Sequence, residues 1–311
     1  MRTNILILGL AMAVRTIAAQ TVPVESGQPF TLSATAELVL LDVSVKSAAG
    51  EPVSGLTRNN FTVYEDGKLQ TVSHFASEDV PVTAGLVIDT SGSMRSKRPE
   101  VITAALAFIG ASNRNDEIFV VHFSDGVNLG LPANIPFTGD LALLRAALWK
   151  GDAQGRTALN DALLLALKHL EQGRRDRRTL VLVSDGGDNC SVHAAAEVTQ
   201  KVLESPATIY TIGIMDEDEP ERNPAQLKRV AQVSGGEAYF PKQLSDVMGI
   251  SLQIANDIRR RYTVGYVPVR SSGHGSLRKI AVTASTPEGH KLVVHTRTSY
   301  SLPPQRPAAN P

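Results

Sequence analysis

Hydrophobic residues in the middle of the chain form short continuous runs that alternate with helical patterns. The runs are typical of strands buried on both faces, and they lie at 82–88, 117–123, 179–183, 208–214 and 237–240. The segments between them have the 3.6-residue periodicity of amphipathic helices, at 98–112, 140–149, 157–172, 192–203, 224–233 and 244–260. Strands that alternate with helices predict the doubly wound α/β class, a mostly parallel sheet with helices on both faces.

The regions on either side of this α/β pattern alternate apolar and polar residues, as half-buried strands do. Residues 37–46 alternate in this way, and two further runs flank Asp66-Gly67, a strong hairpin signal. Strand-like patterns return at 262–267, 277–283 and 291–300. Neither zone is long enough to bury a core alone. We therefore predict that residues 33–80 pair with 261–300 in a small β-sandwich-like domain, into which an α/β domain of residues 81–260 is inserted.

The first twenty residues have the pattern of a secretory signal peptide. A short basic start precedes the apolar run at 5–14, and small residues follow at 16–19. That run is too short to span a bilayer. We expect an exported protein, periplasmic or secreted, with no stable membrane span in the mature chain. The Pro-rich residues 301–311 predict a disordered tail.

Charge and cysteine content exclude several classes of function. Thirty-one basic and thirty-one acidic residues cancel, so no net field favours nucleic acid or anionic lipid as a partner. The sequence contains no G-x-G-x-x-G motif, P-loop or G-x-S-x-G elbow, which argues against nucleotide binding and α/β-hydrolase chemistry. Cys190 is the single cysteine. No internal disulfide can form, and we interpret Cys190 as a partly buried residue rather than a functional thiol.

Three polar segments follow apolar runs or open a helix. They are Asp89-Thr90-Ser91-Gly92-Ser93 after the run 82–88, Gly155-Arg156-Thr157 at the start of a helix, and Ser184-Asp185-Gly186-Gly187 after the run 179–183. In an open parallel sheet, ligands bind at the carboxyl ends of strands where the strand order reverses. Carboxylate and hydroxyl oxygens are hard ligands that suit magnesium. These segments are therefore candidates for a shared cation site.

The three segments, in this order, resemble the metal-ion-dependent adhesion site of the von Willebrand factor type A domain. The resemblance covers about residues 81–261. The flanking sequence at 41–45, 55–56 and 64–68 resembles the bacterial "VWFA-related" family. It implies an Mg²⁺ ion, with Mn²⁺ and Ca²⁺ as alternatives. The ligands it implies are the hydroxyls of Ser91, Ser93 and Thr157, with the carboxylates of Asp89 and Asp185 acting directly or through water.

The same resemblance implies the function. Neutral direct ligands with carboxylates farther out leave the ion electron-poor, so an Asp or Glu of a partner protein is the expected last ligand. The function expected from the resemblance is adhesion, with a protein partner and no nucleic acid.

Each candidate ligand also has a simpler interpretation. Asp89 and Asp185 are common turn residues, and Ser91 and Ser93 could be plain loop hydroxyls. Thr157 could be only an N-cap, a position that threonine favours.

Three acidic features are less directly tied to the site. Asp161 is either a structural helix residue or a hydrogen-bonding support for a ligand. We interpret Asp188 as a loop residue rather than a ligand. The acidic segment 215–221 is interpreted as a solvated loop, with repulsion of acidic partners or a second cation as alternatives.

Two competing functions differ in class. Haloacid-dehalogenase-like phosphatases need a second carboxylate two residues after the first, where this chain has Ser91; we therefore predict that the protein is not an enzyme. The remaining alternative is a structural or assembly scaffold subunit in which the metal mainly stabilises the fold. The helix at 244–260 runs into a strand at Tyr262 without a linker, which motivates the hypothesis that ligand binding is transmitted along this helix.

Overall fold

The structure is a computed structural model that describes residues 38–215, 222–268 and 277–301. The predicted signal peptide lies outside these ranges, as do most of the acidic segment and the predicted tail except Ser301, which ends a strand. None of the helices in the described ranges is long and apolar enough to cross a membrane.

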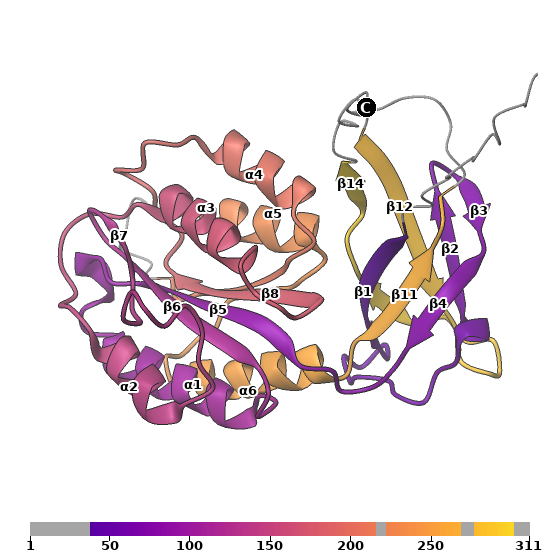
Figure 1. Ribbon diagram of the computed structural model, residues 1–311, viewed down its shortest axis with the longest axis horizontal. Helices are drawn as coiled ribbons and strands as arrows, with labels where there is room; N and C mark the ends of the chain where they lie inside the picture. The colour runs from indigo at the N-terminus through magenta and orange to yellow at the C-terminus, as the bar shows by residue number, and fades with distance from the viewer. Residues whose placement is uncertain (1–37, 216–221, 269–276, 302–311) are drawn as a thin grey trace, which may run out of the picture. The chain divides into compact units, whose positions relative to one another are not determined.

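A six-stranded sheet with the order β10-β9-β8-β5-β6-β7 forms the centre of the α/β part (Figure 1). Its strands are β5 (Val82–Asp89), β6 (Glu117–Phe123), β7 (Val127–Leu129), β8 (Arg177–Ser184), β9 (Thr208–Gly213) and β10 (Ala238–Tyr239). All neighbours pair in parallel except β7, which is antiparallel to β6. Every residue of β5, β6 and β9 is buried, which explains why these strands appear in the sequence as near-continuous apolar runs.

Helices cover both faces of this sheet. They are α1 (Arg98–Ala111), α2 (Leu141–Trp149), α3 (Leu159–Leu170), α4 (Ala195–Glu204), α5 (Pro224–Ser234) and α6 (Asp246–Arg259). Helices α1, α2 and α6 lie on one face, and α3, α4 and α5 on the other (Figure 1). The predicted doubly wound α/β class is confirmed, and each predicted strand and helix of this part is present with its ends within three residues of the prediction.

Two four-stranded antiparallel sheets complete the fold, with the orders β13-β1-β11-β4 and β14-β12-β2-β3. Their strands are β1 (Val39–Lys46), β2 (Phe61–Glu65), β3 (Lys68–Gln70), β4 (Val72–Ala76), β11 (Tyr262–Tyr266), β12 (Leu277–Ala284), β13 (Val293–His295) and β14 (Ser299–Ser301). Each sheet combines strands from before and after the α/β segment, and both contribute to one apolar cluster. The β2–β3 hairpin turns at Asp66 and Gly67, which both have positive φ (48° and 77°), as the Asp-Gly signal predicts for a two-residue turn.

A buried polar cluster lies where β1, β9 and α6 meet. The Asp257 carboxylate of α6 accepts hydrogen bonds from Ser44 and Tyr210, and Arg261 pairs with it at 3.4 Å. Arg261 and Asp257 are each 2% exposed. The end of α6 is therefore held by charged and hydroxyl groups rather than by apolar packing alone.

Candidate metal centre

The candidate residues lie at the carboxyl-terminal edge of the central sheet, at the point where the strand order reverses. The chain passes from β5 to its neighbour β6 and then crosses to β8, the neighbour of β5 on the other side. The loops after β5 and β8 therefore leave adjacent strands at the same edge, which is where open α/β sheets bind ligands.

Hydrogen bonds bring four of the five predicted ligands together at this edge. Ser93 Oγ donates to Asp185 Oδ2 at 2.6 Å, and the hydroxyls of Ser91 and Ser93 are 3.1 Å apart. Asp89 accepts a bond from the Ser91 backbone N–H at 2.8 Å on one oxygen and from Ser184 Oγ at 2.6 Å on the other. Residues from two distant loops thus form one connected polar cluster.

Thr157, the fifth predicted ligand, lines the same cavity. This cavity has a volume of about 160 Å³ and is lined by Ser91, Ser93, Gly155, Arg156, Thr157, Asp185, Gly187 and Asn189. Asn189 fixes the Thr157 main chain, because its Oδ1 accepts from Thr157 N at 2.8 Å and its own N–H donates to Thr157 O at 3.0 Å. Helix α3 begins at Leu159 with Ala158 at its N-cap, so Thr157 is not the cap of this helix.

Backbone contacts join the loop after β5 to the segment before Thr157. Gly92 N–H donates to Gly155 O at 3.0 Å, and Gln154 N–H donates to Thr90 O at 2.9 Å. Gly155 has a φ of +83°, and a Cβ there would lie 2.0 Å from Asp125 Oδ2. A larger residue at position 155 would therefore be strained and would collide with Asp125.

Asp125 also fixes this segment, although the sequence gives no sign of it. Its Oδ1 accepts from both the backbone N–H and the Nε of Arg156, at 3.1 and 3.0 Å. These two bonds, from a residue 31 positions earlier, place Arg156 at the rim of the cavity.

Asp89 is almost fully buried, at 2% exposure, and this burial raises its pKa to about 6. Hydrogen bonds from Ser184 and Ser91 act against the increase, and the nearby charge of Asp185 adds to it. Because the carboxylates of Asp89 and Asp185 are close together and poorly solvated, a positive charge beside them would be favourable.

The donor set fits a hard cation. Within the described part of the chain, no group of three or more His, Cys, Asp or Glu residues could hold a metal. An ion here would depend on the hydroxyls of Ser91, Ser93 and Thr157 together with the two carboxylates. An all-oxygen set of this kind suits Mg²⁺ or Ca²⁺ and lacks the thiolate and imidazole ligands typical of zinc.

Asp161 and Asp188 do not line the cavity but join α3 to the loop that follows β8. Asp188 Oδ2 accepts from Asn160 N–H at 2.8 Å and from Ser191 Oγ at 2.7 Å. Asp161 accepts from the backbone N–H groups of Val192 and His193, at 3.0 and 3.1 Å. Both carboxylates therefore support the loop that carries Asn189, which in turn holds Thr157.

Sequence reasoning missed three residues that shape the cavity. Ser184 stands within the Ser-Asp-Gly motif but received no role, although a hydroxyl directly after a buried strand could have indicated one. Asn189 and Asp125 act on residues about thirty positions away, so no local pattern reveals them. Cys190 is half-buried, its Sγ lies 3.6 Å from Ser124 O, and burial raises the pKa of its thiol.

Fold and cavity together define a Rossmann-like α/β module with a polar cavity at its switch point. The family model of the von Willebrand factor type A domain matches residues 85–187, which include all five candidate ligands and all three motif segments. The chain is a von Willebrand factor type A (VWA) domain protein.

The chain is also similar to two curated proteins. The chain is 27% identical over 183 residues to the uncharacterized protein YfbK of Escherichia coli, covering 56% of this chain and 31% of that protein. It is 27% identical over 143 residues to the uncharacterized protein sll0103 of Synechocystis, covering 44% and 33%. The chain thus spans about a third of the length of these relatives.

Two solved structures share the fold. A von Willebrand factor type A structure from Catenulispora acidiphila matches with a TM-score of 0.53 and 14% identity, over 85% of this chain and 73% of that one. Proximal thread matrix protein 1 from the mussel byssus matches with a TM-score of 0.51 and 13% identity, over 63% and 51%. At these identities the likeness concerns the fold alone.

Proposed function

We propose that this protein is a metal-ion-dependent protein-binding module. The module would hold one Mg²⁺ ion, with Mn²⁺ or Ca²⁺ as alternatives, through Asp89, Ser91, Ser93, Thr157 and Asp185. An Asp or Glu side chain of a partner protein is the proposed ligand from outside.

One observation carries this proposal: a single cavity at the switch point is lined by the hydroxyls of Ser91, Ser93 and Thr157 and by Asp185. Three of the proposed ligands are neutral hydroxyls, so they would neutralise little of the charge of a bound cation. The cation would therefore retain affinity for an anionic ligand from a partner. The chain's own residues position the donors: Asn189 fixes Thr157, and the Ser93–Asp185 bond joins the two loops. The exposed Arg156 guanidinium at the rim, which pairs with Asp125 at 3.0 Å, adds a second cationic group for an acidic partner.

Titration of the purified chain with MgCl₂ in a calorimeter tests the metal site directly. One Mg²⁺ per chain is expected for the native protein, and Asp185→Ala should remove the heat of binding while the circular dichroism spectrum is unchanged. Pull-downs from periplasmic or surface extracts, with and without EDTA, then test the partner. Absence of Mg²⁺ uptake by a folded native chain would refute the proposal.

A scaffold role is the second candidate, and it is favoured by the burial of Asp89 beside the charge of Asp185. A cation beside Asp89 and Asp185 would relieve the cost of two close carboxylates and so stabilise the fold. This role predicts a lower melting temperature in EDTA, with partner binding indifferent to the ion. The adhesion role predicts partner binding that requires the ion.

We further propose that the protein is exported, to the periplasm or the exterior, on the basis of the signal-like residues 1–20. Fusion of residues 1–30 to a reporter that is active only outside the cytoplasm tests this proposal, and a reporter that stays inactive would contradict it.

A further inference from the structure

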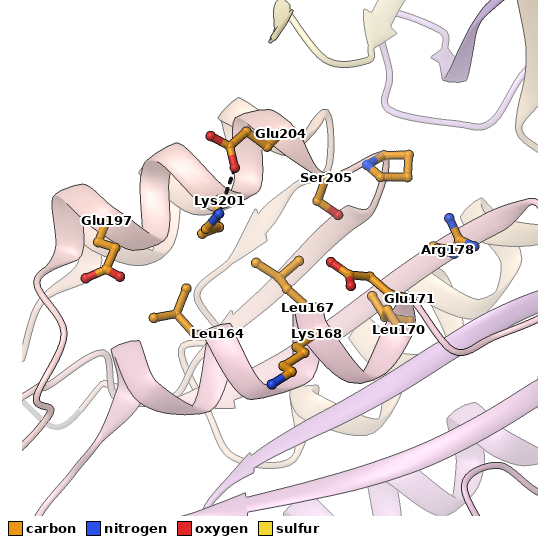
Figure 2. Close-up of a pocket in the computed structure, with 11 residues that line it drawn as sticks. Leu164, Leu167, Lys168, Leu170, Glu171, Arg178, Glu197, Lys201, Glu204 and Ser205 are labelled. Carbon is orange, nitrogen blue, oxygen red and sulfur yellow. Dashed lines mark hydrogen bonds and ion pairs between the residues drawn. The ribbon is translucent and has the colours of Figure 1, made fainter. Parts of the chain in front are cut away.

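A groove of about 430 Å³ lies between α3 and α4, away from the candidate metal centre (Figure 2). Its floor is formed by Leu164, Leu167 and Leu170, and Ser205 and Pro206 lie at one end. This volume lies in the range of sites that bind small molecules or short peptide segments, and an apolar floor with a few polar groups is typical of such sites.

Charged residues of both signs line the groove, namely Lys168, Arg178 and Lys201 with Glu171, Glu197 and Glu204. On the α4 side the acidic residues are in excess, because Glu197 and Glu204 accompany Lys201 alone. Lys201 forms an ion pair with Glu204 at 2.9 Å. The hydrogen bond and charge of Glu204 raise the pKa of Lys201, and the charges of Glu171 and Glu197 add to the effect. Three carboxylates therefore act on one ammonium group. Lys168 and Arg178 leave this excess near Glu197 in place, since the Lys168 ammonium points away from α4 and Arg178 lies at the opposite end of the groove from Glu197 (Figure 2).

The chain passes the end of this groove a second time, at β14. Strand β14 lies against α4, and the Arg297 guanidinium donates to the Ser205 carbonyl oxygen at the groove's end. The sequence directly after β14 is Leu302-Pro303-Pro304-Gln305-Arg306-Pro307, which lies outside the described residues. It combines an apolar residue, prolines and one cation, which complement the apolar floor and the glutamates of α4.

We propose that the α3–α4 groove is a peptide-docking site and that residues 302–307 of this chain occupy it. Leu302 packs on the leucine floor, and Arg306 pairs with the glutamates of α4. Composition alone gives this segment no core of its own, so the groove provides the apolar surface that would order it.

Dimensions and entropy agree with this assignment. A Pro-rich segment rises about 3.1 Å per residue, so Leu302 and Arg306 are about 12 Å apart. A helix rises about 1.5 Å per residue, so Glu204 and Glu197 are about 10 Å apart along α4. Prolines reduce the conformational freedom lost on docking and leave no backbone N–H unpaired against the apolar floor.

The first experiment measures docking in trans. A fluorescent peptide of residues 302–311 is titrated against the chain ending at Ser301, and anisotropy is recorded. We expect saturable binding, roughly fivefold weaker for the Arg306→Glu peptide and for Glu197→Lys protein, as the loss of one favourable surface ion pair predicts. The matched charge control is Glu100→Lys on α1, on the opposite face of the sheet, which should leave binding unchanged.

The full chain serves as competitor in the same assay. Its own segment should exclude the added peptide, because tethering gives an effective concentration in the millimolar range. Equal binding of the peptide to the full and shortened chains would overturn the proposal, as would an unchanged affinity with Glu197→Lys.

A second experiment uses only the full chain and so does not depend on the folding of the shortened one. A spin label is attached to the thiol introduced by Ala309→Cys, in a Cys190→Ser background, and should broaden the methyl signals of Leu164 and Leu167. Adding Arg306→Glu should restore the signals at least in part. Methyl signals that are equally sharp with the oxidised and reduced label would overturn the proposal.

Discussion

Ser93 and Asp185 are 92 residues apart in sequence, yet the Ser93 hydroxyl donates to Asp185 Oδ2 at 2.6 Å. This bond joins the loop after β5 to the loop after β8. The hydroxyl of Ser91 lies 3.1 Å from that of Ser93 and is part of the same hydrogen-bond network. The relationship defines the candidate metal centre more sharply than any single motif, because a hydroxyl donor and a carboxylate from the loops after adjacent parallel strands meet at one edge of the sheet.

Ser93→Ala should weaken Mg²⁺ binding by roughly tenfold or more, the lower end of what the loss of supporting groups around a metal costs. The substitution removes a hydroxyl ligand and the donor to Asp185 at the same time. Calorimetric titration with MgCl₂ measures the effect. Ser73→Ala on β4, whose hydroxyl donates to Gly265 O at 3.4 Å, is the matched control. Equal Mg²⁺ affinities for the native chain and Ser93→Ala would exclude Ser93 as a ligand.

Thr157 permits a test that separates metal binding from stability. Among the described residues, its hydroxyl has no hydrogen-bond partner, so the nearly isosteric Thr157→Val should change the free energy of unfolding by no more than about 0.5 kcal/mol. The same change should abolish Mg²⁺ binding, whereas Thr157→Ser should retain it. Urea unfolding in EDTA and calorimetry give the two readouts. Retained Mg²⁺ binding in Thr157→Val would remove this residue from the site.

Asp188 and Asp140 cap helices in similar ways but at different distances from the site. Asp188 accepts from Asn160 N–H near the start of α3, and Asp140 accepts from Ala142 and Leu143 N–H at the start of α2. Either change to Ala should cost about 1 kcal/mol of stability. Only Asp188→Ala should also weaken Mg²⁺ binding, because Asp188 supports the loop that fixes Thr157. Equal Mg²⁺ affinity in both variants would reduce Asp188 to a plain cap.

Asp116 should make stability depend on pH. Burial raises its pKa to about 6, although it accepts bonds from Val82 and Asn113 N–H. A carboxyl group whose pKa is higher in the folded than in the unfolded state increases the free energy of unfolding at low pH. This stabilisation is lost as the pH rises from about 4 to about 6. Asp116→Asn should therefore flatten the pH profile of the free energy of unfolding across this window. The exposed Asp152→Asn is the control, and parallel native and Asp116→Asn profiles would contradict the assignment.

The strands of the central sheet could be predicted because a strand that is buried on both faces consists mostly of apolar residues. Strands such as Glu117–Phe123 contain only buried residues, so they nearly coincide with apolar runs in the sequence. The three site segments were found for a related reason, since polar residues directly after buried strands stand out. The resemblance to VWA domains then implied a joint role as metal ligands, which remains a prediction and which spacing alone did not indicate.

Other features depend on contacts that no local pattern encodes. The short strand β7 (Val127–Leu129) has no buried residue and therefore no periodic signal. Helix α3 begins two residues later than predicted, because the Thr157 backbone is held by Asn189 rather than by the helix. The role of Asp125 follows only from its position beside Gly155 in the folded chain.

The cluster around Arg261 bears on the hypothesis that ligand binding is transmitted along α6. Arg261 donates to Tyr210 OH at 2.9 Å and to Gly235 O at 2.8 Å, next to Asp257 on the last turn of α6. Burial alone would raise the pKa of Asp257, but Arg261 and the hydroxyls of Ser44 and Tyr210 lower it overall. Any shift of α6 would require Asp257 to leave these partners, so hydrogen exchange in residues 244–260, with and without Mg²⁺ and ligand, measures whether such a shift occurs.

Arg261→Met should destabilise the protein by about 3–5 kcal/mol, because it leaves the buried Asp257 carboxylate without its cation. Asp257→Leu alone should cost a similar amount, since Arg261 then lacks its carboxylate. The double variant should lose clearly less than the sum of the two, because it buries no unpaired charge. Urea unfolding of the three variants measures this coupling, with Arg259→Met, an exposed partner of Asp79 at 2.7 Å, as a control expected to cost no more than about 1 kcal/mol. Additive losses would show that Arg261 and Asp257 stabilise the fold independently, through Gly235 and Ser44 rather than through each other.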